Sequence, residues 1–474
     1  MNRHTRGFLA RLFVTVSLVA LLPSEAKLRQ MSEDPVWSLA ATGDSIVTRR
    51  IAVYDDPAFR RLLDVIRGAD VGFTNLECQL LRLSSFAGYP QAEHGGGYEL
   101  GPPEAAEDLK WAGFDLVSRA NNHTADYGIE GMLETSRSVE KAGLVQAGVG
   151  MTAGEAAQAA YLDTGKGRFA LISFATTFSP AGRAGEARQE IRGRPGLNAL
   201  RVQRTYQLSP QDMAAFRGVA AALGVQVPSS NTATLRLGRQ LFAPGPDSRT
   251  IERLNSLDED RILRSVRSAA RQADYVVVTS HSHESGRTPE EPPPFLVDFA
   301  RRCLDAGAQM FIVHGPHRVR GIEVYRGKPI FYSLADFIFQ YETTEPQGAD
   351  IYEDFGVEDR LALAGDLYER EHQRDAYGPD PANSHWWESI VAVPVFRKHE
   401  LVELRLYPIE LGHRARALTG DGRSQRGTPR LATEPLAREV ITAVARLSAP
   451  FGTRILYRDG IGHWEPAPAA SQSR

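Results

Sequence analysis

Short apolar segments alternate with amphipathic segments along most of this chain, and this alternation restricts its possible folds more than any other feature. Residues 37–42, 71–76 and 114–118 are apolar runs bounded by turn-forming residues, which is typical of buried strands. Between them, residues 56–66 and 103–112 have the pattern of helices. Strands that alternate with helices predict an α/β fold.

The alternation also suggests how the chain is divided. It weakens over residues 181–255, where Gly, Pro and Arg are frequent, and we interpret this stretch as an insertion at one edge of the sheet. It returns at residue 259, while residues 341–388 form an acidic, Tyr-rich segment typical of a long functional or partner loop. The pattern therefore predicts one domain over residues 37–412 and a C-terminal extension, 413–474, with one helix and one strand.

The N-terminus has the three parts of an export signal. Arginines precede an apolar run over residues 12–22, and Ser24-Glu25-Ala26 supplies the small residues that a signal peptidase recognises. The run is too short for an ordinary membrane span, which favours a signal peptide over residues 1–26, with an uncleaved N-terminal anchor as the alternative. Either interpretation predicts an exported protein, periplasmic or extracellular, that is free or held at the membrane by its N-terminus.

Charge and cysteine content exclude two classes of protein. The 55 Lys and Arg residues are balanced by 58 Asp and Glu residues, and the formal net charge is -3. This balance gives no electrostatic basis for binding nucleic acid. Only two cysteines are present, so the chain is not a small scaffold held together by disulfides.

The polar residues that close the apolar strands are of the types that bind metals. They are Asp44, Asn75, Glu77, Asn122, His123, His281, His283, His314 and His317. Mixed oxygen and imidazole ligands suit divalent ions such as Zn, Mn or Fe. Strand ends at one edge of a sheet are where α/β proteins build their sites. We therefore expect these residues to converge at one edge of one sheet, around one or two ions that bind a water and the oxygens of a substrate.

Taken singly, each of these residues has a simpler explanation. An Asp that follows a Gly at a strand end, such as Asp44, is usually a turn residue or a helix cap, and Asn122 alone would most often be a turn residue. The pair His314 and His317 is a stronger signal, because two imidazoles share one rigid turn that contains proline. The metal interpretation depends on the convergence of the whole set.

A series of motifs runs through the same residues. The motifs are Gly43-Asp44, Asn75-Leu76-Glu77, Ala120-Asn121-Asn122-His123 with Asp126-Tyr127-Gly128, Arg194-Pro195-Gly196 and His314-Gly315-Pro316-His317. Together with residues 321–340, which are the most specific part, they resemble the CapA proteins, which are poly-gamma-glutamate capsule biosynthesis proteins. The resemblance covers residues 37–340, or extends to about 410. CapA proteins are similar to the calcineurin-like metallophosphoesterases, so the resemblance implies a four-layer α/β/β/α sandwich with insertions and a dinuclear metal site.

The resemblance also implies a role for each matching residue. The metal ligands would be Asp44, Glu77, Asn122, His281, His314 and His317, and the metals one or two divalent ions among Mn, Zn, Fe and Mg. Glu77 would bridge the two ions, and Asn122 would bind the second. His123 would be the catalytic acid that protonates the leaving group. The residues expected to contact substrate are Asn75, Asn121, His283 and Glu284.

Two departures from the phosphoesterase pattern concern the first ion. Ile46 stands where the phosphoesterases have a histidine, and Glu77 is one methylene longer than the usual bridging Asp. A third departure follows the lone histidine, where Ser282-His283 replaces the usual Trp-Gly. His283 is therefore a candidate for the missing ligand.

Two functions fit this interpretation. One is an exported metal-dependent hydrolase of capsule or poly-gamma-glutamate-type polymer biosynthesis, acting on a phosphoester or on a polymer amide. The other is a non-catalytic component that binds the polymer during capsule synthesis or export, and a purely structural role for the strand-end residues is a third alternative. The expected partners are an anionic polymer or phosphoester substrate and membrane proteins of capsule synthesis, but not nucleic acid.

Overall fold

The computed structural model describes residues 35–92, 94–95, 97–227, 234–238, 240–357, 361–367, 370, 384–412 and 426–466. The predicted signal segment, part of the predicted loop over residues 341–388 and residues 413–425 lie outside the described residues. The chain from Val36 onward forms one compact unit with a mixed α/β fold, as the alternating pattern predicts. None of the described helices is both long and apolar enough to span a membrane.

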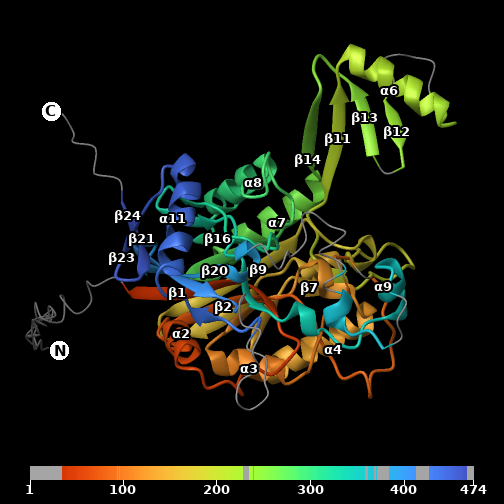
Figure 1. The fold of residues 1–474 in the computed structure, drawn as a ribbon. Helices are drawn as coiled ribbons and strands as arrows, with labels where there is room; N and C mark the ends of the chain where they lie inside the picture. Colours follow the sequence, from red (N-terminus) through yellow and green to blue (C-terminus); the bar gives the residue numbers. More distant parts are fainter. Residues whose placement is uncertain are drawn as a thin grey trace, which may run out of the picture. The chain divides into compact units, whose positions relative to one another are not determined.

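The larger sheet contains the N-terminal strands and the last strands of the chain (Figure 1). Its main path, in spatial order, is β23 (Arg454–Arg458), β24 (Ile461–Glu465), β21 (Glu400–Glu410), β20 (Glu388–Arg397), β1 (Val36–Ile46), β2 (Val71–Leu76), β5 (Leu116–Ser118) and β6 (Val145–Ala147). Two further strands join it, namely β19 (Asp336–Phe339) beside β1 and β22 (Arg430–Leu431) beside β21. Because β1, β2, β5 and β6 are parallel, their carboxyl ends lie at the same edge.

The smaller sheet has six strands among the described residues. Their order is β17 (Ile322–Tyr325), β18 (Lys328–Phe331), β16 (Met310–His314), β15 (Tyr275–His281), β9 (Gly167–Ala175) and β8 (Ala160–Thr164). The central strands β9, β15, β16 and β18 are parallel, so this sheet too has one edge where several carboxyl ends meet.

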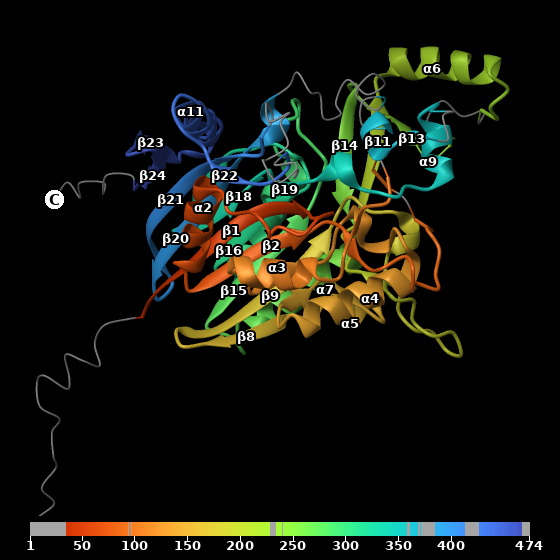
Figure 2. The same cartoon turned by 60° about the horizontal axis from the view of Figure 1, so that its bottom comes forward.

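The two sheets pack face to face, with helices on their outer sides (Figures 1 and 2). Between the sheets, the Trp37 ring of β1 stacks on Phe396 and meets the edge of Phe169 of β9, with ring centroids 4.4 and 5.1 Å apart. The helices α2 (Pro57–Arg67) and α3 (Ala105–Ala112) bury their apolar faces on the larger sheet, and α7 (Ser256–Ala269) and α8 (Pro294–Asp305) on the smaller one. Burial of apolar side chains on both faces of each sheet fixes where the strand ends meet.

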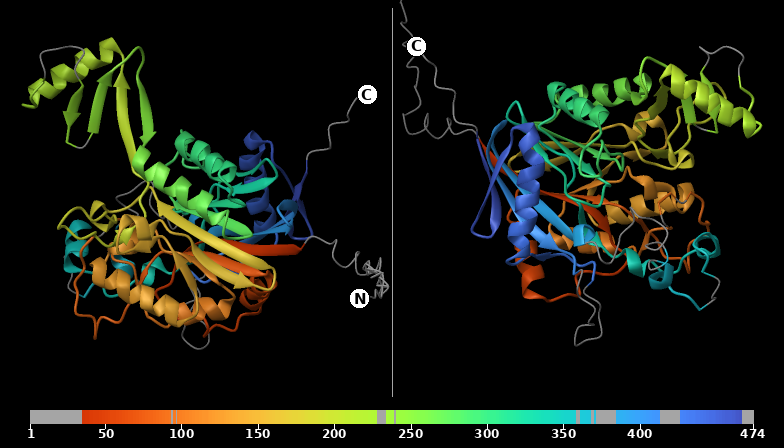
Figure 3. Two further views of the ribbon diagram at one scale, coloured as in Figure 1. Left: turned by 180° about the vertical axis from the view of Figure 1, so that it is seen from behind. Right: turned by 45° about the horizontal axis from the view of Figure 1, so that its top comes forward.

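The stretch expected to be an insertion contains a small sheet of its own (Figure 3). Its elements are β11 (Val202–Leu208), α6 (Pro210–Ala222), β12 (Leu235–Leu237), β13 (Gln240–Pro244) and β14 (Arg249–Leu254). Phe216 of α6 packs on Phe242 of β13 with ring centroids 4.1 Å apart. The C-terminal residues form α11 (Leu436–Ser448), β23 and β24, and β24 pairs with β21 of the larger sheet.

The remaining short elements are connections. They are β3 (Gln79–Leu80), β4 (Leu100–Gly101), η1 (Asn122–Ala125), α4 (Gly128–Lys141), β7 (Val149–Gly150), α5 (Ala153–Ala156), η2 (Pro180–Gly182), β10 (Gly196–Leu197), η3 (Tyr341–Thr343), α9 (Ala349–Asp354), η4 (Ser384–Trp387) and η5 (Ala449–Phe451). Among them, η1 matters most for function because it begins at the carboxyl end of β5, where the predicted Asn122 and His123 stand.

Candidate metal centre

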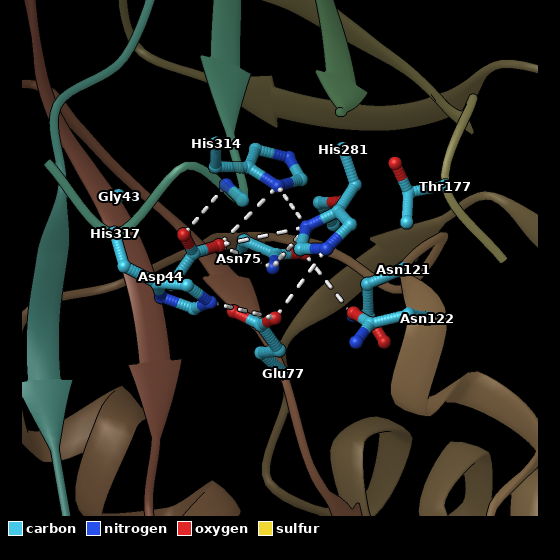
Figure 4. A network of polar contacts seen from close by, with 12 residues as sticks. Gly43, Asp44, Asn75, Glu77, Asn121, Asn122, Thr177, His281, His314 and His317 are labelled. Carbon is cyan, nitrogen blue, oxygen red and sulfur yellow. Dashed lines mark hydrogen bonds and ion pairs between the residues drawn. The ribbon is translucent and has the colours of Figure 1, made fainter. Parts of the chain in front are cut away.

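The predicted residues converge, but they come from two sheets. In the larger sheet, Asp44 of β1 pairs with Asn75 of β2, and Glu77 follows β2 directly. In the smaller sheet, His281 and His314 pair as the last residues of β15 and β16. The expectation of one edge of one sheet is therefore wrong. The two sheets pack on each other through their apolar faces, so the carboxyl ends of strands from both sheets meet at one place (Figure 4).

Asp44, His281 and His314 form one potential ligand set, and all three are fully buried. The Nδ1 atoms of His281 and His314 are 3.0 Å apart, and they lie 3.7 and 3.4 Å from Oδ1 of Asp44. Ligand atoms around a tetrahedral zinc ion are roughly 3.4 Å apart, so these separations suit a single ion. The Thr279 hydroxyl lies 2.7 Å from Nε2 of His314 and fixes the orientation of that ring.

Glu77 lies on the other side of His281. Its Oε1 is 3.4 Å from Nε2 of His281 and 4.0 Å from Nε2 of His283, and these two ring nitrogens are 2.9 Å apart. Glu77 is fully buried, yet neither of its carboxylate oxygens has a hydrogen-bond partner among the described residues. A buried carboxylate without donors is costly, so this arrangement points to a cation as the partner.

Asp336 is a site residue that the sequence analysis missed. It begins β19, pairs with Asp44 of β1, and places Oδ1 2.8 Å from Nδ1 of His317. Its other oxygen, Oδ2, is buried with no hydrogen-bond partner in the described part of the chain. Asp44, Glu77, His317 and Asp336 each offer a ligand atom within 4.8 Å of the others. The available signal was an acidic residue inside an apolar run, because a buried carboxylate needs a partner.

Two glycines allow the backbone to close around Asp44. A Cβ atom at Gly43 would lie 1.6 Å from the carbonyl oxygen of Ala335, which also accepts a hydrogen bond from the Asp44 N–H at 3.0 Å. Gly315 has a φ of 111°, which side chains strongly disfavour. Its N–H donates to Oδ2 of Asp44 at 2.7 Å. The Asp44 carboxylate is therefore held in one orientation.

Asn75 and Asn121 position their neighbours. Nδ2 of Asn75 donates to Oδ1 of Asp44 at 2.8 Å, and Nδ2 of Asn121 donates to the carbonyl oxygen of Leu76 at 2.7 Å. Both side chains are buried. These bonds tie the ends of β1, β2 and β5 together, and the substrate contacts expected of these two residues stay predictions.

Asn122 and His123 stand at the start of η1. Nδ2 of Asn122 donates to the carbonyl oxygen of His94 at 2.7 Å, while its Oδ1 is buried without a partner among the described residues. Nδ1 of His123 lies 2.8 Å from Oδ2 of Asp126, which orients the ring. A positive charge on His123 would lower the pKa of His283 after the effects of burial and His281, so the two rings lie in the same site.

His283 and Glu284 form the more open side of the cluster. The side chain of His283 is 33% exposed, and its backbone N–H donates to Oγ1 of Thr177 at 2.9 Å. Oε2 of Glu284 accepts hydrogen bonds from the hydroxyls of Thr176, Thr177 and Ser282 at 2.7, 2.9 and 2.8 Å. A substrate would approach the buried residues past this side. The direct substrate contacts expected of His283 and Glu284 stay predictions.

Burial controls the charge states in the cluster. Burial raises the pKa of Glu77 well above its usual value, and the Asp44 carboxylate raises it further. Burial alone would also raise the pKa of Asp44, but hydrogen bonds from His281 and His314 hold it well below its usual value. Burial lowers the pKa of His281 to about 3. His281 is therefore a neutral imidazole at pH 7, which is the form that binds a metal.

Comparison with known proteins assigns the family. A family model described as Bacterial capsule synthesis protein PGA_cap matches residues 38–341, which is more than half of the chain. The chain belongs to this family. The match spans every residue of the predicted site and also Asp336, and it confirms the resemblance to CapA proteins.

Individual relatives of the family agree with this assignment. Uncharacterized protein y4sH of Sinorhizobium fredii (strain NBRC 101917 / NGR234) is 39% identical over 432 residues, or 90% of this chain and 92% of that protein. PGA biosynthesis protein CapA of Bacillus subtilis (strain 168) is 25% identical over 349 residues, or 71% of this chain and 73% of that one. A crystal structure of a hypothetical protein from Thermus thermophilus has 14% identity and a TM-score of 0.31, covers 84% of this chain and 100% of its own, and carries no structural argument.

Ile46 does not belong to the polar cluster of this family member. It packs in an apolar cluster with Phe339, Trp386, Trp387 and Leu411. The Trp386 ring also stacks on the ring of His317, with centroids 4.9 Å apart and planes at 19°. The wall of the site on this side is therefore apolar, and the extra carboxylate comes from β19 instead.

Proposed function

We propose that this chain is an exported, metal-dependent hydrolase of capsule or poly-gamma-glutamate-type polymer biosynthesis, acting on a phosphoester or on a polymer amide. The observation that carries the proposal is the Glu77 carboxylate, which is fully buried among histidines and has no hydrogen-bond partner in the described part of the chain. The packing of helix, sheet, sheet and helix supports the finer proposal of a four-layer sandwich of the metallophosphoesterase type.

The residues present fit two cation positions. Asp44, His281 and His314 would hold one divalent ion, and Glu77 and Asp336 with His317 would hold another beside the Asp44 carboxylate. A divalent ion in such a site acts as a Lewis acid on a phosphoryl or carbonyl oxygen. The buried Oδ1 of Asn122 is a further available oxygen.

The chain's own residues supply orientation and a proton. Asn75 and Gly315 hold the two oxygens of Asp44, so the ligand geometry is fixed before a substrate arrives. The pair of His123 and Asp126 presents an oriented imidazole that could give a proton to a leaving oxygen or nitrogen. Burial of the cluster excludes most water, which strengthens these electrostatic effects.

The test combines metal content with turnover. Purified protein should contain one to two divalent ions and hydrolyse a generic phosphoester or a gamma-glutamyl oligomer. His281→Ala should lose metal and activity, while His463→Ala, a matched change on the edge strand β24, should keep both. Absence of metal in the wild type, with no gain in Tm on addition of Mn or Zn, would refute the metal site.

A non-catalytic polymer-binding role in synthesis or export is the second candidate. It is favoured by the closure of the cluster, because Asp44, Glu77, His281 and His314 are all fully buried and His283 is only one-third exposed. In this case the protein would bind metal and polymer without turnover. Membrane proteins of capsule synthesis are the partners we propose for either role.

The proposed location is outside the cytoplasm, on the basis of the basic and apolar N-terminal sequence. Sequencing of the mature N-terminus should give a start near Lys27, or else the full chain should fractionate with membranes. Full-length protein found free in the cytosol would contradict export.

A further inference from the structure

A basic pocket lies apart from the metal centre, where the loop after β9 meets the start of α7. Its volume is about 340 Å³, and its charged lining residues are Arg183, Arg201, Arg261, Arg264, Glu186 and Asp258. Four arginines against two carboxylates leave a local excess of positive charge. The chain as a whole has a formal net charge of -3, so this concentration of arginine is a local feature.

The carboxylate of Asp258 is already engaged, which leaves part of the positive charge uncompensated. Asp258 accepts hydrogen bonds from Nε of Arg201 at 2.6 Å and from Nη1 of Arg261 at 3.0 Å, and its side chain is 3% exposed. Neither Arg183 nor Arg264 forms an ion pair among the described residues. Burial, followed by the positive charges of Arg201 and Arg194, lowers the pKa of Arg183, which shows how little negative charge surrounds it.

The pocket is connected to the metal centre by a short loop. Thr177 accepts the hydrogen bond from the His283 N–H, and Arg183 follows six residues later. In the same loop Gly182 packs against Ala125 of η1, the turn that carries His123. Six residues span at most about 20 Å, so one short stretch of polymer could reach both places.

We propose that this pocket binds carboxylate groups of an anionic polymer next to the metal centre. The planar fork of an arginine matches a carboxylate through two parallel hydrogen bonds, and a polymer with a carboxylate on each unit can use several arginines at once. None of the lining residues is aromatic, so the pocket lacks the stacking surfaces that bind single-stranded nucleic acid. The identity of this polymer as the substrate rests on the proposed function, whereas the binding of carboxylates does not.

The experiment measures binding of fluorescently labelled poly-gamma-glutamate to the full chain by anisotropy, in EDTA so that the metal centre is empty. Arg183→Gln should weaken binding by about tenfold, the effect of one charge-assisted hydrogen bond. Arg264→Gln should act in the same direction. Both variants should fold, because Arg183 is only half-buried and Arg264 is exposed on α7. The control Arg397→Gln changes an exposed arginine at the opposite end of β1, paired with Val36, and should bind like the wild type.

The outcomes separate this inference from the proposed function. Wild-type affinity in both pocket variants, with binding that requires added Mn and is lost in His281→Ala, would place the polymer at the metal centre and overturn the pocket. Inorganic phosphate that displaces the polymer at equal anion concentration would overturn the carboxylate assignment. Binding that persists in EDTA and falls in Arg183→Gln supports the pocket even if no hydrolysis is found.

Discussion

Replacing Glu77 with Gln should separate the cost of the buried carboxylate from its use in binding metal. Without metal, neither oxygen of Glu77 has a hydrogen-bond partner in the described part of the chain, and burial raises its pKa well above the usual value. Glutamine has the same size but no charge. We therefore expect metal-free Glu77→Gln to be at least as stable as the metal-free wild type, whereas added metal should stabilise only the wild type.

The expected sizes follow from the size of the compact unit and from the buried group. A ligand at 100 times its Kd adds about 2.7 kcal/mol to the free energy of unfolding. The unit from Val36 to Arg474 has about 440 residues, so its unfolding entropy near Tm is about 0.9 kcal/mol/K. Metal should thus raise the Tm of the wild type by about 3 °C. Removing an unsatisfied buried carboxylate, at about 1–3 kcal/mol, should raise the metal-free Tm by about 1–3 °C.

The pH dependence has a definite sign. The folded-state pKa of Glu77 is raised, so between the unfolded value of about 4.3 and the folded value the folded state holds more protons than the unfolded state. Stability of the metal-free wild type should therefore fall as pH rises through this window. The Gln variant should lack this contribution.

The assay is a set of thermal scans in EDTA and in Mn at several pH values, with Glu323→Gln as the matched control. Glu323 is also buried, but it has partners in Arg301 and the Tyr332 hydroxyl. Its replacement should lower Tm equally with and without metal. A Glu77→Gln protein that loses as much metal-free stability as Glu323→Gln, or that keeps the full response to Mn, would refute the reasoning.

Three further changes test other parts of the structure. His123→Ala should keep the bound metal but lower turnover by about 10²–10⁴-fold, and elemental analysis that shows loss of metal would contradict its role as an acid. Asp258→Asn should cost about 2 kcal/mol at pH 7 in urea unfolding; burial alone would raise the pKa of Asp258, but its hydrogen bonds to arginine lower it, so the stabilisation is present above the unfolded pKa and is lost as pH falls through the folded pKa. Ile46→His should lower Tm without tightening metal, because the new ring would stand among apolar side chains, and tighter binding would show that this position faces the ions.

Much of the site could be predicted from the sequence because its residues have a local signature. Asp44, Glu77, His281 and His314 each follow or end an apolar run, and that pattern depends only on burial of one strand at a time. Motif resemblance then added the roles. The same reasoning located most helices, since their apolar faces are visible in the spacing of residues such as Phe59 and Leu62 on α2.

Strand pairing could not be predicted in the same way. Periodicity shows that a strand is buried but not which strand lies beside it, so the division of the strand ends between two sheets was hidden. The parallel pairing of β1 with β19, which brings Asp336 opposite Asp44, joins segments far apart in the sequence. The role of Arg183 was missed for the same reason, because its pocket is formed only when the loop after β9 meets α7.

Asp336 suggests how a centre without a histidine at position 46 could still hold two ions, and it makes the two positions chemically different. The set of Asp44, His281 and His314 offers two nitrogens and one oxygen, whereas the set that includes Glu77 and Asp336 offers three carboxylates and one imidazole. Imidazole-rich sets favour zinc, and hard oxygen donors favour Mn or Mg. Titration of metal-free protein should therefore show Zn filling one position first and Mn the other. Asp336→Asn should weaken Mn binding and leave the Zn position intact. Equal loss of both metals in Asp336→Asn would mean that Asp336 only orients His317, and the centre would then have a single position.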